Sequence, residues 1–475
     1  MIGCSAANMS TSLSQAPARQ PILDIRDLSV SFETQDGRVE AVKKLSFDVA
    51  RGECLGLVGE SGSGKSQTVL AAMGLTAANG IVEGSIRFDG VEMTGLDRKQ
   101  LNDIRGARMA MIFQDPLTSL TSHMTVGAQM AEVLARHKKM KGAEAERRII
   151  DWLERVRIPE AKRRLHQFPH ELSGGMRQRV MIASAMLCEP QVLLADEPTT
   201  ALDVTVQAQV LDLMDELKRE IGAGLVLITH DMGVIARMAD RVVVMRYGEA
   251  VERGEVDAVF AAPQHAYTRM LLDAMPRMDR TDRGSRPSIG APPPKEVTPI
   301  LEVDDLHVTF PVSVPGGLFG KRVPLRAVDG VSLSLRPGET VGVVGESGCG
   351  KSTLARGVLK LLDPSAGSVA WLGRNIAQAS RSEMQPLRQE LQIVFQDPLA
   401  SLDPRMTIGQ SIAEPLTVFR PEVDAKGREA AAREIMQRMD LDPNLVNRYP
   451  HELSGGQNQR VGIARAMILR PKLVV

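Results

Sequence analysis

The chain has 475 residues, which at roughly 100–200 residues per domain predicts about two to four domains. Its 58 basic residues equal its 58 acidic ones, whereas proteins that bind nucleic acid usually carry a basic excess. Only 10 Phe, 3 Tyr and 2 Trp are present, too few for the exposed aromatic surfaces on which bases stack. The composition therefore predicts a globular protein that does not bind nucleic acid.

The four cysteines, Cys4, Cys54, Cys188 and Cys349, lie far apart, which excludes a Cys-x-x-Cys metal or redox pair. Such separation is typical of a reducing compartment. No apolar run reaches the roughly 18 residues that predict a membrane span. Residues 1–20 are small and polar and lack the apolar segment of a signal peptide, so we expect a disordered tail on a cytosolic protein.

Three segments occur twice in the same order, which identifies two copies of one module. The pairs are GESGSGKS at 59–66 and GESGCGKS at 345–352, FQDPLTSL at 113–120 and FQDPLASL at 395–402, and FPHELSGGMRQR at 168–179 and YPHELSGGQNQR at 449–460. Between the copies, residues 277–298 are rich in Pro, Arg, Ser and Gly, the composition of a linker. We therefore expect a first domain over 21–276 and a second over 299–475.

Apolar runs in the first copy predict strands of a buried parallel sheet, and periodic apolar residues predict helices between them. The expected strands are Cys54–Val58, Gln191–Ala195 and Leu225–Ile228, and the expected helices begin at Ser66 and cover 143–165 and 177–187. The helical stretch 143–165 lies between two of these strands in sequence. The pattern predicts an α/β core with a helical subdomain.

A glycine-rich loop with the pattern Gly-x4-Gly-Lys-Ser follows the first predicted strand. Its glycines let backbone N–H groups point at phosphate oxygens, and the following helix N-terminus adds positive potential. Lys65 is expected to reach the β- and γ-phosphates, and the Ser66 hydroxyl to bind Mg²⁺. A chance glycine-rich turn is the alternative, but a second match in the same context makes chance untenable. The expected nucleotide-binding residues are Gly59, Glu60, Ser61, Gly62, Ser63, Gly64, Lys65 and Ser66, then Gly345, Glu346, Ser347, Gly348, Cys349, Gly350, Lys351 and Ser352.

Two acidic residues and a histidine follow the later strands of the first copy. Asp196 and Glu197 end an apolar strand, where α/β sheets hold their ligands. We expect Asp196 to hold Mg²⁺ and Glu197 to polarise the attacking water, although capping of the next helix is the alternative for an isolated pair. His230 ends the strand after them and is expected to contact the γ-phosphate and the water; a structural histidine is the alternative.

Two further motifs are weak alone and gain weight because they are duplicated. Ser173-Gly174-Gly175 and Ser454-Gly455-Gly456 each begin a predicted helix, whose N-terminus suits an anion; an ordinary helix capped by the serine is the alternative. Gln114 and Gln396, each in FQDPL, follow an apolar strand and could reach Mg²⁺ or water. A plain turn before proline is the alternative for both glutamines.

The ordered set of phosphate loop, FQDP, LSGG, strand with Asp-Glu, TALD and histidine resembles the ATP-binding domain of ABC transporters. The resemblance covers about 21–276 and 299–475, and implies two P-loop NTPase domains of α/β class. Residues Pro263–Leu272, PQHAYTRMLL, resemble the segment that ends the ATPases of dipeptide, oligopeptide and nickel importers. The linker has no cysteine, so the iron–sulfur cluster of some family members is not expected.

The resemblance implies that ATP and Mg²⁺ bind between two domains packed head to tail. The first site would use Gly59–Ser66, Gln114, Asp196, Glu197 and His230, closed by Ser454 and Gly456, with Phe32 as the candidate for stacking on adenine. The second site would use Gly345–Ser352 and Gln396, closed by Ser173 and Gly175. Ser66, Gln114, Asp196, Ser352 and Gln396 would be the metal ligands.

The resemblance also implies partners and a location. Two transmembrane permease subunits would receive the ATPase domains, and a periplasmic or extracellular solute-binding protein would deliver the solute. The ATPase would lie peripherally on the cytoplasmic face of the cell inner membrane, and its ATP binding and hydrolysis would energise import of peptides or related small solutes. A soluble ABC ATPase without a transport role, and a nucleotide-binding product that does not drive transport, remain as alternatives.

The second copy departs from the family pattern at its end. Asp196 lies 24 residues after Leu172, so its counterpart would fall 24 after Leu453, beyond Val475. We therefore expect a C-terminally truncated second domain, with exposed apolar surface in 299–475 and a weakly active second site. Met176 and Asn458 also differ from the residues usual beside LSGG.

Overall fold

A computed structural model describes most of the chain. The described residues are 20–34, 37–115, 119–199, 202–275, 297–313, 322–346 and 348–475. The chain forms two compact units, Met1–Thr281 (unit 1) and Asp282–Val475 (unit 2), and each is considered by itself. The predicted tail and linker fall outside the described residues except for Gln20, Val297 and Thr298, and Ser347 also falls outside them.

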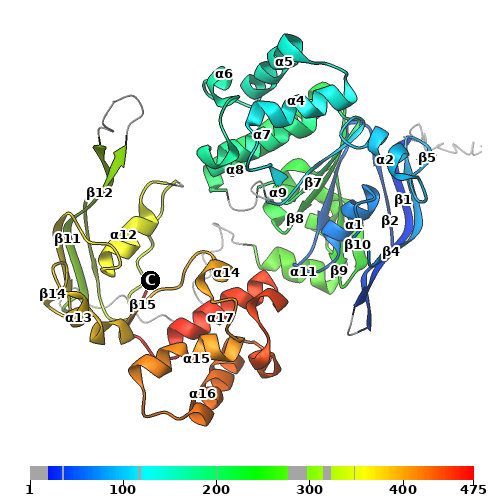
Figure 1. Ribbon diagram of the computed structural model, residues 1–475. Coiled ribbons are helices and arrows are strands. Elements are labelled where there is room, and N and C mark those ends of the chain that lie inside the picture. The colour runs from blue at the N-terminus through cyan, green and yellow to red at the C-terminus, as the bar shows by residue number, and fades with distance from the viewer. Residues whose placement is uncertain are drawn as a thin grey trace, which may run out of the picture. The chain divides into compact units, whose positions relative to one another are not determined.

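A six-stranded sheet in the order β10-β9-β3-β8-β7-β6 forms the centre of unit 1 (Figure 1). Its strands are β3 (Cys54–Val58), β6 (Met109–Ile112), β7 (Val192–Asp196), β8 (Gly224–Thr229), β9 (Arg241–Arg246) and β10 (Glu249–Glu255). All neighbours run parallel except β10, which pairs antiparallel with β9 at the edge. Every residue of β3, β7 and β8 is buried, which explains why these strands read as continuous apolar runs. The predicted parallel core is confirmed.

A second, antiparallel sheet in the order β2-β1-β4-β5 was not predicted from the sequence. It comprises β1 (Pro21–Thr34), β2 (Gly37–Ala50), β4 (Gly80–Phe88) and β5 (Val91–Glu92). Its apolar residues share one core with helix α1 (Lys65–Ala72) and with Leu55 and Leu57 of β3. Cys54 and Val58 of β3 face a different core, formed with the helices. The parallel sheet is therefore covered on both sides.

The helices of unit 1 supply the second cover and a helical subdomain (Figure 1). They are α2 (Arg98–Ile104), α4 (Val126–His137), α5 (Gly142–Arg155), α6 (Ala161–Arg164), α7 (Gly174–Met186), α8 (Val204–Ile221), α9 (Met232–Met238), α10 (Val256–Ala261) and α11 (Ala266–Asp273). The helical stretch predicted over 143–165 consists of α5 and α6. The two helices are separated where Arg157 and Glu160 adopt left-handed φ values of 59° and 54°.

Unit 2 repeats the antiparallel sheet, here ordered β12-β11-β13-β14, and the helical subdomain. Its strands are β11 (Leu301–Ser313), β12 (Arg322–Leu335), β13 (Ala366–Trp371), β14 (Arg374–Asn375), β15 (Leu391–Gln392) and β16 (Leu473–Val474). Its helices are α12 (Lys351–Val358), α13 (Arg381–Met384), α14 (Pro398–Ser401), α15 (Ile408–Phe419), α16 (Ala425–Arg438) and α17 (Gly455–Met467). Strands β15 and β16 pair in parallel, as β6 and β7 do in unit 1.

The apolar run before the second glycine-rich loop does not form a strand. Residues 341–346 have no regular structure, and Val341, Val343 and Val344 are 43%, 49% and 91% exposed. In unit 1 the matching strand β3 lies between β8 and β9, and among its described residues unit 2 has no strand matching either one. Without neighbours an apolar run cannot satisfy its backbone as a strand.

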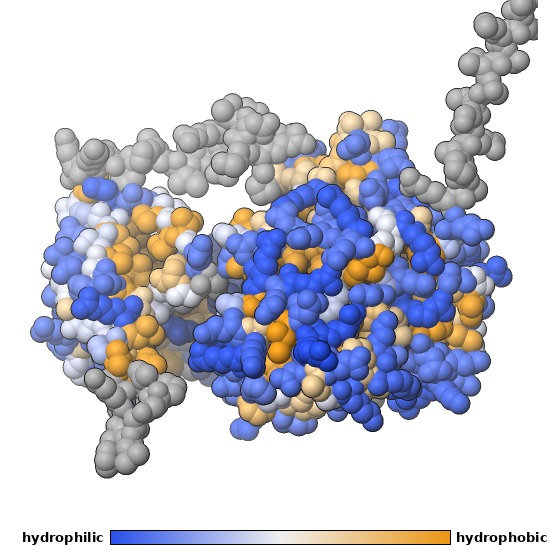
Figure 2. Space-filling view, turned by 90° about the horizontal axis from the view of Figure 1, so that it is seen from above, coloured by the Kyte–Doolittle hydropathy of each residue, from blue (hydrophilic) through white to orange (hydrophobic). Residues whose placement is uncertain are grey.

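Among the helices that the structure describes, none has the length and apolar character needed to cross a membrane. Figure 2 shows a face that is mostly hydrophilic, with smaller apolar patches between charged regions.

Candidate functional site

The loop between β3 and α1 has a backbone that only glycine permits at several positions. Gly59, Gly62 and Gly64 have φ values of 152°, 84° and 97°. A Cβ on Gly64 would lie 2.2 Å from the carbonyl oxygen of Ala41, and one on Gly59 would lie 2.2 Å from that of Met245. Strands β2 and β9 therefore hold the loop so closely that two of its glycines have no room for a side chain.

The side chain of Lys65 lies inside this loop. Its Nζ donates to the carbonyl oxygens of Gly59 and Glu60, both at 2.8 Å, and to Ser63 Oγ at 3.4 Å. Burial lowers the pKa of Lys65, and the nearby carboxylates of Glu197 and Asp196 oppose that shift. Neutral carbonyl oxygens therefore bind the ammonium group here. A negatively charged phosphate would form stronger hydrogen bonds with it and replace them.

Asp196 lies at the carboxyl end of β7, beside the start of α1. Its Oδ1 accepts a hydrogen bond from Ser66 Oγ at 3.0 Å, and the residue is only 6% exposed. Burial raises the pKa of Asp196, which the Ser66 hydrogen bond opposes and the Glu197 charge reinforces. Burial therefore disfavours the charged carboxylate, and a cation beside it would offset that cost.

Glu197 joins two other predicted residues. Its Oε2 accepts from Gln114 Nε2 at 2.9 Å, and its Oε1 lies 3.1 Å from His230 Nδ1. Glu197 has a left-handed φ of 46° and its N–H donates to the Ile228 carbonyl at 3.0 Å, so strand β8 fixes its backbone. The hydrogen bond to Glu197 is the main cause that raises the pKa of His230.

The structure therefore brings together six predicted residues from four separate parts of the sequence. Gln114 follows β6, Asp196 ends β7, Glu197 follows it, and His230 follows β8. Because these strands are parallel, their carboxyl ends meet at the edge of the sheet where the glycine-rich loop begins. The result is an ammonium, a hydroxyl, an amide, two carboxylates and an imidazole around one edge. Such a set can bind a polyphosphate with its cation and activate a water.

The two serine–glycine motifs lie at helix N-termini, one in each unit. Ser173 caps α7 by accepting from the Met176 N–H at 3.4 Å. Ser454 caps α17 by accepting from the Gln457 N–H at 3.3 Å, and Gln457 Oε1 accepts from the Ser454 N–H at 2.9 Å. Gly175 and Gly456 lie in the first turns of these helices. The observed capping is the plainer alternative that the sequence allowed, and it leaves the anion-binding role untested.

The second loop repeats the conformation of the first. Gly345, Gly348 and Gly350 have φ values of 157°, 82° and 100°. Lys351 Nζ donates to the carbonyl oxygens of Gly345 at 2.7 Å and Glu346 at 2.6 Å, and lies 3.7 Å from the Cys349 sulfur.

Ser352 and Gln396 are exposed in unit 2. Among the described residues of unit 2, none matches Asp196, Glu197 or His230. The structure therefore gathers a full set of the predicted groups only in unit 1, as far as the chain is described.

Two aromatic residues bear on the site in different ways. Phe32, the candidate for adenine stacking, is half-buried on β1 beside Gly80, where an added Cβ would lie 3.0 Å from its ring. Tyr267 of α11 was not predicted as a site residue, yet its hydroxyl accepts the Glu60 N–H at 3.0 Å. Its position in the PQHAYTRMLL segment was the only sequence signal, and that signal indicated family alone.

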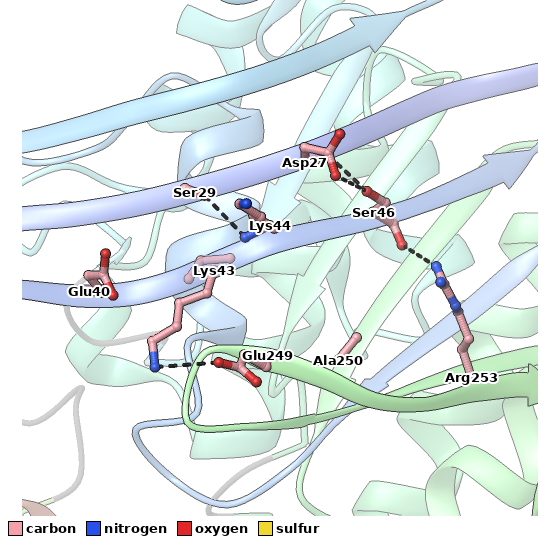
Figure 3. Close-up of a pocket in the computed structure, with 10 residues that line it drawn as sticks. Asp27, Ser29, Glu40, Lys43, Lys44, Ser46, Glu249, Ala250 and Arg253 are labelled. Atoms are coloured by element: carbon pink, nitrogen blue, oxygen red, sulfur yellow. Dashed lines mark hydrogen bonds and ion pairs between the residues drawn. The ribbon is translucent and has the colours of Figure 1, made fainter.

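A charged hollow is lined by residues of β1, β2 and β10 (Figure 3). Its lining carries equal numbers of acidic and basic side chains. Lys43 Nζ lies 3.6 Å from Glu249 Oε1, and Arg253 donates to the neutral Ser46 carbonyl oxygen at 3.2 Å. Such balanced charges give no preference for a ligand of either sign. The edge site around Lys65 is therefore the better candidate.

Comparison with known proteins identifies the family. Residues 42–200 and 328–475 match the ABC transporter family, and 251–299 match the oligopeptide/dipeptide transporter C-terminal region. The glutathione import ATP-binding protein GsiA of Pectobacterium atrosepticum is 46% identical over 480 residues, covering 96% of this chain and 76% of that protein. The peptidoglycan transport ATP-binding protein YejF of Agrobacterium fabrum is 46% identical over 461 residues, covering 96% and 82%.

A solved structure, the dimeric post-hydrolysis state of the ATP-binding cassette MJ0796 with ADP and phosphate, matches 49% of this chain and 98% of that one. Its TM-score is 0.45 and its identity is 27%. The family match covers both copies of the duplicated module, and the relatives align over nearly the whole chain. The chain belongs to the ABC transporter family and is one of its ATP-binding ATPases.

Proposed function

We propose that this chain is the ATP-binding and ATP-hydrolysing subunit of an importer for peptides or related small solutes. The observation that carries the proposal is the cluster at the sheet edge, where Glu197 lies between Gln114 and His230 and beside the Lys65 loop. The oligopeptide/dipeptide transporter match over 251–299 and the printed names of the relatives support the solute class.

Each residue of the first site has its own role in phosphoryl transfer. Lys65 leaves the carbonyls of Gly59 and Glu60 to bind the β- and γ-phosphates, while loop N–H groups hold the remaining oxygens. Glu197 accepts a proton from the attacking water, which its position at the strand end and its contacts with Gln114 and His230 support. His230 orients that water and the γ-phosphate. Phe32 stacks on adenine.

The residues present also fit Mg²⁺. Ser66 Oγ and Asp196 Oδ1 are oxygen donors 3.0 Å apart, and the Gln114 amide lies on the same edge. Magnesium prefers oxygen ligands and usually takes only one or two from the protein, with phosphate and water completing its shell. When bound, Mg²⁺ would neutralise charge on the phosphates. Ser352 and Gln396 are the corresponding donors proposed for the second site.

Several further parts of the function are proposals that rest on the family. The two ATPase domains pair head to tail, so that Ser454 and Gly456 close the first site, and Ser173 and Gly175 close the second. Both motifs place helix N-terminal N–H groups where a phosphate could be bound, which supports this pairing. Two permease subunits and a solute-binding protein complete the importer, with the ATPase peripheral to the cytoplasmic face of the inner membrane.

Substitution of Glu197 tests the catalytic assignment. Glu197→Gln keeps the shape and the Gln114 contact but removes the base, so the ATPase rate should fall by about 10²–10⁴-fold while ATP binding persists. Glu216→Gln is a matched control, because the Glu216 side chain is 63% exposed and pairs with the surface residue Arg157 at 3.2 Å. Chelation of Mg²⁺ should abolish the wild-type rate. An unchanged rate in Glu197→Gln would disprove the assignment.

Transport requires its own test. The full chain would be reconstituted with its permease pair and binding protein in vesicles, and uptake of labelled glutathione and of a labelled tripeptide would be measured with ATP supplied on the side of the ATPase. Uptake of either solute that Glu197→Gln abolishes supports the proposal. An ATPase rate that does not change with permease or solute but rises with RNA or DNA would favour the non-transport alternative.

A further inference from the structure

One peptide group of the glycine-rich loop is held at both of its ends. The group between Gly59 and Glu60 has its carbonyl oxygen bound by Lys65 Nζ at 2.8 Å. Its N–H, on the Glu60 side, donates to the hydroxyl oxygen of Tyr267 at 3.0 Å. A peptide group is planar, so fixing the N–H also fixes where the carbonyl points. Tyr267 and Lys65 are therefore connected through a single rigid plane.

Tyr267 is itself rigidly placed. Its ring is 2% exposed, and the Arg246 guanidinium lies 4.7 Å from the ring centre. Helix α11 is tied to the edge strand, because Glu252 of β10 accepts the N–H groups of Gln264 at 2.7 Å and His265 at 3.0 Å. Burial raises the pKa of Tyr267, so its hydroxyl stays neutral at working pH. The hydroxyl is thus a fixed acceptor aimed at the loop.

The glycine at this peptide makes such an anchor useful. Gly59 has a φ of 152°, a region open mainly to glycine, and glycine can turn its peptide at little steric cost. Lys65, which binds the carbonyl oxygen of this peptide, is 5% exposed. Its two shortest hydrogen bonds go to the carbonyl oxygens of Gly59 and Glu60. A flipped peptide would point an N–H at the ammonium group in place of a carbonyl.

We propose that Tyr267 is a positioning residue for ATP binding, which fixes the Gly59–Glu60 peptide and thereby holds Lys65 ready for the phosphates. The residue lies in the 251–299 segment, outside the part of unit 1 that matches the ABC transporter family at 42–200. The C-terminal region thus contributes a group to the nucleotide site. The inference rests on the proposed phosphate-binding role of Lys65.

Loss of the hydroxyl should act on affinity more than on the chemical step. Without its acceptor, the Gly59–Glu60 peptide populates other orientations, and only the competent fraction of loops binds ATP; the dissociation constant rises by the inverse of that fraction. A single neutral hydrogen bond of this kind corresponds to about a two- to tenfold change. Once ATP is bound, the phosphates hold the loop, so kcat changes little.

The test uses the full chain carrying Lys351→Ala, so that the first site dominates binding. Calorimetry would measure the Kd of the non-hydrolysable analogue adenylyl imidodiphosphate with Mg²⁺, and steady-state assays would give KM and kcat for ATP. Tyr267→Phe should raise Kd and KM by about two- to tenfold and leave kcat within about twofold. Tyr247→Phe is the matched control. The Arg246 guanidinium also lies near the Tyr247 ring, 5.0 Å from its centre, but Tyr247 is 71% exposed. Its Kd should equal that of the parent.

The other outcomes distinguish a failure of this inference from a failure of the proposed phosphate-binding site. An unchanged Kd in Tyr267→Phe, with binding lost in Lys65→Ala, would overturn the inference and leave the proposed site intact. A lower melting temperature and lower kcat with an unchanged Kd would show that the hydroxyl only stabilises packing, which also overturns it. Normal binding by Lys65→Ala would refute the proposed site itself.

Discussion

Alanine at Gly64 and at Gly62 should destabilise unit 1 to different degrees, although both positions have left-handed φ values, 97° and 84°. Holding an alanine in such a conformation costs about 1–2 kcal/mol at either position. At Gly62 the added Cβ meets nothing within 4 Å. At Gly64 it would lie 2.2 Å from the Ala41 carbonyl oxygen, which strand β2 holds in place. Forced overpacking adds about 1–3 kcal/mol more.

These energies convert to melting temperatures at roughly 2–4 °C per kcal/mol for a unit of this size. Gly62→Ala should therefore lower the melting temperature of unit 1 by about 2–8 °C, and Gly64→Ala should lower it further, by about 4–20 °C in all. Differential scanning calorimetry of the nucleotide-free chain measures both shifts. The second loop is an internal replicate, since a Cβ on Gly348 meets nothing and one on Gly350 lies 2.1 Å from the Ala327 carbonyl oxygen.

Equal shifts for Gly62→Ala and Gly64→Ala would refute the argument, because the backbone strain is similar and only the carbonyl contact differs. A larger shift for Gly62→Ala than for Gly64→Ala would also refute the argument, and more directly.

Two smaller predictions concern one histidine and one helix cap. The pKa of His230 is raised chiefly by its hydrogen bond to Glu197, so the stability it adds is full below its unfolded pKa and is lost as pH rises through the folded pKa. The melting-temperature difference between wild type and His230→Gln should therefore be larger at pH 6 than at pH 8.5, and a difference that grows with pH would contradict this. Met176→Gln should complete at Ser173 the capping box that Gln457 forms in unit 2, and raise stability by about 0.3–1.5 kcal/mol in a denaturant titration. Met176→Leu, which cannot bond the Ser173 N–H, should give no such gain.

Local patterns were enough to predict the centre of unit 1. The apolar run Cys54–Val58 became β3 with its predicted bounds, and Leu225–Ile228 lies within β8. The order of glycine loop, acidic pair and histidine predicted which residues would meet, because parallel strands bring their carboxyl ends to one edge. Gln114, Asp196 and Glu197 do meet there. These features depend on neighbours in sequence or on one simple topology.

Only the tertiary structure decided the rest, because it depends on partners distant in the chain. Val341–Val344 is as apolar as β3, yet it remains irregular where no described strand lies beside it. The helical stretch expected over 143–165 divides into two helices where Arg157 and Glu160 adopt left-handed φ values, a boundary that the apolar periodicity does not predict. The contact of Tyr267 with Glu60 joins residues 207 positions apart in the sequence, and the Arg246 guanidinium packs against the Tyr267 ring. The sequence by itself determined the chemistry available at the site, and long-range packing determined which groups fix its geometry.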